Sequence, residues 1–233
     1  MYLNYQTFKK NLDKSKKKLL SSYNLLFSYI VIDENKYELL EQPISQQILF
    51  SLFEDNESTC KSEILKIRNG EITNYKNFTT KFDYIFIHPM ISILPFLNNV
   101  ITFYKEKYPN SKIIILTSDQ HQHEKLIGGP ESENISNNIL DHYNNIDYLI
   151  SGFAEHSSIS LLINNPSKGV FSKRHVLSNN KNSVHFFDYD SIGELHLKSL
   201  KINNHNNSIR IQRSRGCLSS CTYCIEGQAN KTH

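Results

Sequence analysis

The sequence contains no apolar run that approaches the roughly 20 residues needed to cross a bilayer, so no membrane-spanning segment is expected. Glycine is scarce, with 8 residues among 233, which excludes a collagen-like chain. Residues 1–18 have no apolar stretch after their lysines and are not typical of a secretory signal. Hydrophobic residues nevertheless make up 39% of the chain, enough for a packed core. We therefore expect a folded cytoplasmic protein with no membrane partner.

The positive charge of the chain is concentrated near its N-terminus. Lys and Arg number 26 against 23 Asp and Glu, which is a net charge of +3. Residues 1–20 contain six Lys and one Asp, a local charge of +5, so the other 213 residues carry −2. A lysine-rich helix face exposed to solvent explains this cluster better than a nucleic-acid patch, because arginine and interleaved aromatic side chains are missing from it. Nucleic acid is therefore not an expected partner.

Apolar runs alternate with segments of helical spacing through the middle of the chain. We expect strands at residues 25–32, 84–88, 112–117 and 146–151, helices at 37–53, 91–108, 135–143 and 155–163, and a hairpin of 64–67 with 71–74. Strands separated by helices indicate right-handed crossovers and a parallel sheet. The continuous runs YIFI and IIIL are typical of strands covered on both faces. The predicted fold class is α/β, a Rossmann-like, doubly wound, mostly parallel sheet.

This pattern divides most of the chain into three regions. Residues 1–24 are expected to form a polar helical segment, residues 25–165 the Rossmann-like domain, and residues 166–207 a connector of loop and short strands. Within the connector, residues 183–188 and 194–200 are the segments that we expect to be ordered.

Three of the four cysteines lie within eight residues, as Cys217, Cys221 and Cys224 in the spacing C-x-x-x-C-x-x-C. In a reducing compartment such a cluster indicates a metal site and not a disulfide framework. Three thiolates can bind three irons of a cubane cluster and leave the fourth iron without a protein ligand. Structural zinc, with Cys60 or His233 as fourth ligand, is one alternative, although zinc usually takes paired C-x-x-C elements and only one is present. Three unrelated free thiols are the other.

The segment around these cysteines resembles the cluster loop of radical S-adenosylmethionine (SAM) enzymes. The spacing is the same, the aromatic Tyr223 stands just before the third cysteine, and Ser214-Arg215-Gly216 is similar to a lead-in found in one large branch. That branch carries an N-terminal cobalamin-binding-like domain. The order of KIIILT, Gly128-Gly129-Pro130 and IDYLISGFAE resembles such a domain over about residues 25–165.

The resemblance implies a 4Fe-4S cluster on Cys217, Cys221 and Cys224, with SAM bound through its amino and carboxylate groups to the open iron. It also implies that the backbone near Tyr223 lies against the adenine and that a flavodoxin-type or ferredoxin-type protein donates the electron. The reduced cluster would cleave SAM to a radical that abstracts hydrogen, for methylation or rearrangement of an unactivated carbon. The resemblance identifies no catalytic residue and no substrate.

The resemblance leaves cobalamin binding open. A cobalamin site would lie at the carboxyl ends of the parallel strands, and the residues expected near it are Ser118, Gly128, Gly129, Gly152 and Glu155. The D-x-H-x-x-G motif of many such domains is incomplete, because Glu124 stands where glycine is needed after Asp119 and His121. We expect His121 and His123 to belong to a polar loop and His88 to be packed in the core. For Glu155, a carboxylate that stabilises a helix N-terminus is the simpler interpretation.

The chain ends nine residues after Cys224. A (β/α)-type barrel takes roughly 250 residues, so residues 208–233 are expected to hold only the first strand and the cluster loop of a truncated radical SAM barrel. We therefore expect this chain not to be catalytic alone. Two further hypotheses remain at this point: a non-catalytic module that binds a corrinoid or a partner and carries a vestigial cysteine tail, and a small zinc-stabilised protein.

Overall fold

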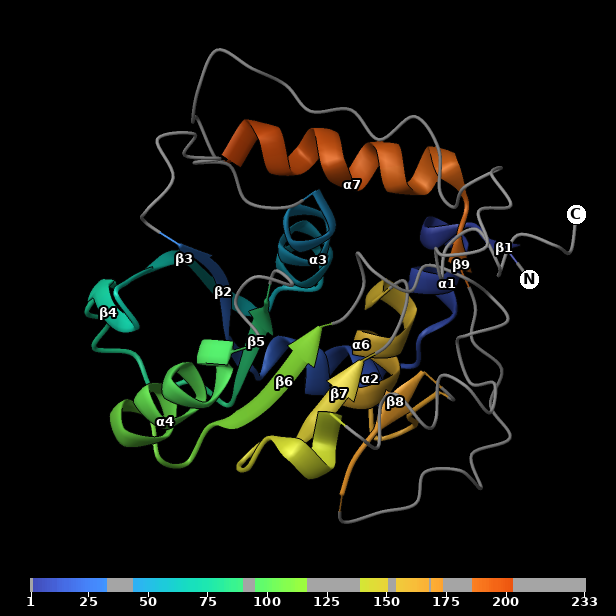
Figure 1. Cartoon of the computed structure of the whole chain (residues 1–233). Helices are drawn as coiled ribbons and strands as arrows, with labels where there is room; N and C mark the ends of the chain where they lie inside the picture. The colour runs from blue at the N-terminus through green and yellow to red at the C-terminus, as the bar shows by residue number, and fades with distance from the viewer. Residues whose placement is uncertain are drawn as a thin grey trace, which may run out of the picture.

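The structure is a computed structural model of the whole chain (Figure 1). It describes residues 2–32, 44–89, 95–116, 139–150, 154–167, 169–173 and 186–202.

Seven of the described strands form one sheet in the order β4-β3-β2-β5-β6-β7-β8. The strands are β2 (Asn24–Ile32), β3 (Thr59–Arg68), β4 (Glu71–Asn74), β5 (Tyr84–His88), β6 (Lys112–Leu116), β7 (Tyr148–Ile150) and β8 (Val170–Phe171). The five central strands, β3, β2, β5, β6 and β7, are parallel to one another. The two edge strands, β4 and β8, pair antiparallel with their neighbours. The chain is thus an α/β protein with a mostly parallel sheet, compatible with the predicted Rossmann-like fold.

The central strands are buried on both faces, as their continuous apolar runs predicted. All five residues of β5 are buried. In β2, Leu25 and Phe27 belong to one hydrophobic core, whereas Leu26 and Ile30 belong to a second core on the opposite face of the sheet. This separation follows from the alternation of side chains along a strand.

Helices cover both faces of the sheet. On the Phe27 face lie α3 (Ile44–Asp55) and α6 (Ala154–Leu162), which contact each other. On the opposite face lies α4 (Leu97–Lys107), which packs through Val100, Ile101 and Tyr104. The sheet is therefore sandwiched between two helical layers, as in doubly wound folds.

The N-terminal segment and the segment before residue 202 also contribute to this body. The N-terminal segment forms β1 (Tyr2–Leu3), α1 (Tyr5–Asn11) and α2 (Lys14–Ser21), and the later segment forms β9 (Phe186–Phe187) and α7 (Tyr189–Ile202). Strands β1 and β9 pair in parallel as a separate two-stranded sheet. Side chains from both segments enter the core that contains Phe27; they are Tyr5, Leu12, Leu20, Phe187, Ile192 and Leu195. The core therefore extends across the boundaries expected at residues 24 and 165.

Two elements differ from the sequence-based expectation. Residues 194–200 were expected in a connector of loop and short strands, but they lie within the helix α7. The physical reason is that Ile192 and Leu195 are three residues apart, so both reach the same buried helix face. The strand expected at 64–67 is longer: β3 pairs antiparallel with β4, as predicted, but also in parallel with the whole length of β2.

Among the described helices, none is both long and apolar enough to cross a bilayer.

Candidate functional site

The strand order places a topological switch point between β2 and β5. Strand β2 lies between β3 and β5, and the chain order of the five parallel strands is 2-1-3-4-5 across the sheet. In this order the chain leaves β2 toward β3 and leaves β5 toward β6, so the connections run in opposite directions from this pair of strands. Doubly wound proteins bind ligands at this switch point.

Tyr29 and His88 mark the switch point within the sheet. They are register partners near the carboxyl ends of β2 and β5, and the centroids of their rings are 6.0 Å apart. Both side chains are buried. His88 is therefore packed in the core, as the sequence predicted.

Among the described residues, α3 and α6 carry buried polar atoms without a hydrogen-bond partner, among them those of Gln46, Ser51 and Ser158. Gln46, in the first turn of α3, is fully buried, and both polar atoms of its amide lack a partner among the described residues. Ser158, in α6, is also fully buried, and its Oγ likewise lacks a described partner. Buried polar groups of folded proteins are nearly always hydrogen-bonded, so groups of this kind are candidates for contact with water, an ion or a ligand. Nothing in the sequence pattern distinguished Gln46 or Ser158 from ordinary polar helix positions.

Glu155 is the one residue of the predicted cobalamin site that the structure describes. It lies in the first turn of α6, the helix that follows β7, and only 3% of it is exposed. A carboxylate at this position interacts favourably with the helix N-terminus. Its placement therefore fits the helix-stabilising interpretation and also brings it to the same edge of the sheet as Gln46.

The other predicted site residues lie outside the described part of the chain. They are Ser118, Gly128, Gly129, Gly152, Cys217, Cys221, Tyr223 and Cys224, together with the loop histidines His121 and His123. Within the described ranges, no three His, Cys, Asp or Glu side chains gather as a metal site would require.

Cys60 is described, and its environment argues against a role as a metal ligand. The side chain lies on β3 and packs against the core. Burial and the nearby charge of Glu54 raise the pKa of its thiol to about 12. The thiol is therefore neutral at ordinary pH, whereas metals bind the thiolate.

A second buried polar cluster lies under α4 and is fully hydrogen-bonded. The hydroxyl of Tyr104 lies 2.5 Å from Ser28 Oγ and 2.7 Å from Glu63 Oε1, and the Lys76 backbone N–H donates to Glu63 Oε2 at 2.9 Å. Burial, followed by the charge of Glu63, raises the pKa of Tyr104 well above its usual value. The phenol is therefore a permanent hydrogen-bond donor. The cluster joins α4 to β2 and β3 and serves to hold the sheet together.

Comparison with known proteins does not assign the chain to a family. No family model matches it, and no curated protein matches it. One solved structure, described as a candidate platelet activating factor from Streptococcus pneumonia, is similar over 86% of this chain and 98% of its own length. The two chains are 17% identical and the TM-score is 0.31, a similarity too low to support any statement about function.

Proposed function

We propose that the chain is part of a radical SAM iron–sulfur protein, in which Cys217, Cys221 and Cys224 hold a 4Fe-4S cluster. The observation that carries this proposal is the C-x-x-x-C-x-x-C spacing with Tyr223 before its third cysteine. Three thiolates fit such a cluster because they leave one iron without a protein ligand, available to the amino and carboxylate groups of SAM. When bound, the cluster supplies one electron for radical chemistry on an unactivated carbon.

In the same proposal, the Rossmann-like domain binds a corrinoid at the carboxyl edge of the sheet. The 2-1-3-4-5 strand order supports a ligand at that edge. The orphaned amide of Gln46 and hydroxyl of Ser158 supply buried hydrogen-bonding groups beside it. The corrinoid itself rests on the resemblance of residues 25–165 to cobalamin-binding domains.

Anaerobic reconstitution with iron and sulfide tests the cluster. We expect a brown protein with about four iron and four sulfide per chain, and loss of the colour in the Cys221→Ala variant. Cys60→Ala is the matched control, and it should keep the colour because its thiol is neutral and lies in the sheet. A colourless protein that binds one zinc tightly would contradict the proposal and favour the zinc-stabilised alternative.

Titration with hydroxocobalamin tests the corrinoid part separately. We expect a change in the corrinoid absorption spectrum on binding, and weaker binding in Gln46→Leu. Because the Gln46 amide has no described partner, leucine should leave the apo protein at least as stable. Gln6→Leu, on the exposed surface of α1, is the control. An unchanged spectrum with the wild-type protein would remove the corrinoid from the proposal and leave the cluster in place.

A further inference from the structure

We propose that α7 is a strap that can detach from α3 while the sheet stays folded. Its first turn is the hinge, and an ion pair with Asp55 holds it near its other end. The proposal rests on the packing of α7 and is independent of the proposed function.

The position of α7 makes it separable from the rest of the fold. It lies across α3, on the side of that helix away from the sheet (Figure 1). Among residues 190–198, the part of α7 whose side chains the structure describes, the buried side chains share one face and are Ser191, Ile192, Leu195 and His196. Glu194 and Leu197 on the other side are exposed. Elements with few buried apolar contacts open locally at lower free energy than the core.

The first turn of α7 is joined to the N-terminal segment by several hydrogen bonds. The Tyr5 backbone N–H donates to Ser191 Oγ at 2.8 Å, and the Asp188 backbone N–H donates to the Leu3 carbonyl at 2.9 Å. These bonds continue the β1–β9 pairing, and the ring of Phe187 packs against that of Tyr5. Backbone pairing of this kind does not depend on a single side chain. The beginning of α7 is thus the hinge.

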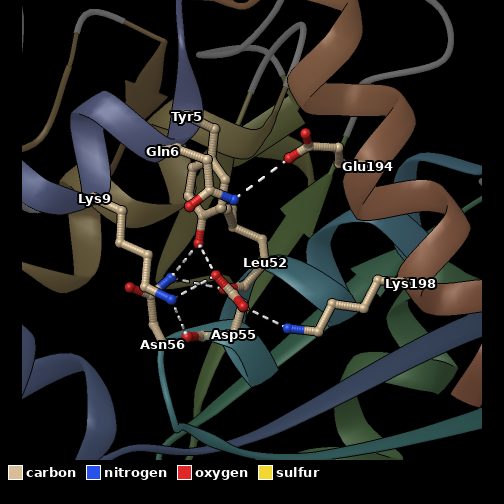
Figure 2. A network of polar contacts seen from close by, with 8 residues as sticks. All are labelled: Tyr5, Gln6, Lys9, Leu52, Asp55, Asn56, Glu194 and Lys198. Atoms are coloured by element: carbon tan, nitrogen blue, oxygen red, sulfur yellow. Dashed lines mark hydrogen bonds and ion pairs between the residues drawn. The ribbon is translucent and has the colours of Figure 1, made fainter.

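Near the other end of α7, the described polar attachment is one ion pair. Lys198 Nζ donates to Asp55 Oδ1 at the end of α3 (Figure 2). The other carboxylate oxygen, Oδ2, accepts from Lys9 Nζ at 2.6 Å and from the Tyr5 hydroxyl at 2.9 Å. One carboxylate therefore holds both α1 and α7 against α3. Loss of its charge should loosen both helices, whereas loss of Lys198 should loosen α7 alone.

Burial of Asp55 by itself would raise the pKa of its carboxyl, but the hydrogen bonds from Lys198, Lys9 and Tyr5 outweigh burial and lower it. The carboxylate is therefore charged at ordinary pH. Its side chain is 20% exposed and that of Lys198 is 41% exposed, so solvent reaches this fastening point. An ion pair in such a position can be broken without unfolding the core that it covers.

Amide hydrogen exchange of the full chain, measured by mass spectrometry without iron, sulfide or SAM, tests the strap. In Lys198→Met we expect exchange in residues 195–202 to accelerate by about two- to fivefold, the scale of a partly exposed ion pair, with α1 and β5 unchanged. In Lys9→Met we expect α1 to accelerate and α7 to stay as in the wild type. Asp55→Asn should accelerate both helices. Lys16→Met, whose ion pair with Asp13 lies on the surface of α2, is the control.

Two results would overturn the strap. One is an unchanged exchange rate in residues 195–202 of Lys198→Met. The other is acceleration of β5 and β6 to the same extent as α7, which would mean that α7 opens only when the whole domain unfolds. Should Asp55→Asn fail to fold, the two lysine variants still decide the question. The test is independent of the cluster, so its failure is distinguishable from failure of the proposed function.

Discussion

Replacing Tyr104 by phenylalanine would remove one hydroxyl from the buried cluster under α4. The ring would remain, with its edge-on contact to Phe103 at 5.2 Å between centroids. What is lost is the hydroxyl between Ser28 Oγ and Glu63 Oε1. Since the aromatic packing is kept, the variant isolates the contribution of the polar contacts.

The expected cost follows from the burial of Glu63, which is 2% exposed. Its Oε2 keeps the N–H of Lys76, but Oε1 loses the hydroxyl of Tyr104, and water cannot easily replace that donor. Leaving a buried charged group short of one hydrogen bond costs about 1–3 kcal/mol. With the Ser28 hydroxyl also losing its partner, we expect the free energy of unfolding to fall by about 2–3 kcal/mol.

Urea denaturation followed by far-UV circular dichroism measures this change, since the chain has no tryptophan to report on unfolding. The midpoint should fall with the slope unchanged. Tyr75→Phe, at a tyrosine that is 47% exposed, is the matched control and should change stability by less than about 0.5 kcal/mol. In a double-mutant cycle with Glu63→Gln, the two costs should not add. A Tyr104→Phe protein as stable as the control, or strictly additive costs, would refute the reasoning.

Three further predictions concern other buried groups. Burial lowers the pKa of His196 below the usual histidine value of about 6.5, so the unfolded chain binds the proton at a higher pH than the folded chain does. The free energy of unfolding should therefore not depend on this group above about pH 6.5 and should fall below it, and His196→Gln should flatten that fall in unfolding curves taken between about pH 7.5 and about pH 5. Cys60, whose pKa is raised to about 12, should react slowly with iodoacetamide in the native protein and rapidly in urea; rapid native labelling would show that it is not protected. Phe27→Ala removes a ring whose centroid lies 5.0 Å from that of Phe86, and it should lower the free energy of unfolding by about 3–5 kcal/mol. The control Leu197→Ala, at an exposed position, should lower it by less than about 0.5 kcal/mol, and equal urea midpoints for the two variants would contradict this.

Local chemistry explains which features were predictable from the sequence. The strands β2, β5 and β6 have continuous apolar runs because they are covered on both faces, so their positions could be read directly. The cysteine spacing is also local, because ligands to one cluster can come from a single loop. The proposed iron–sulfur function depends on that spacing.

Other features depend on residues that are far apart in the chain, and only the tertiary structure decided them. The alternating burial of β3 is typical of a hairpin, whereas its parallel pairing with β2 depends on α3, which connects the two strands and packs on the Phe27 face of the sheet. The polar character of Gln46 carried no sign that its amide would be buried without a described partner. Asp55 binds Lys9 and Lys198, which are 46 and 143 residues away, and no local pattern encodes such a contact. Short-range periodicity determines where strands and helices form, whereas strand order and the attachment of α7 arise only when distant side chains compete to bury the same surface.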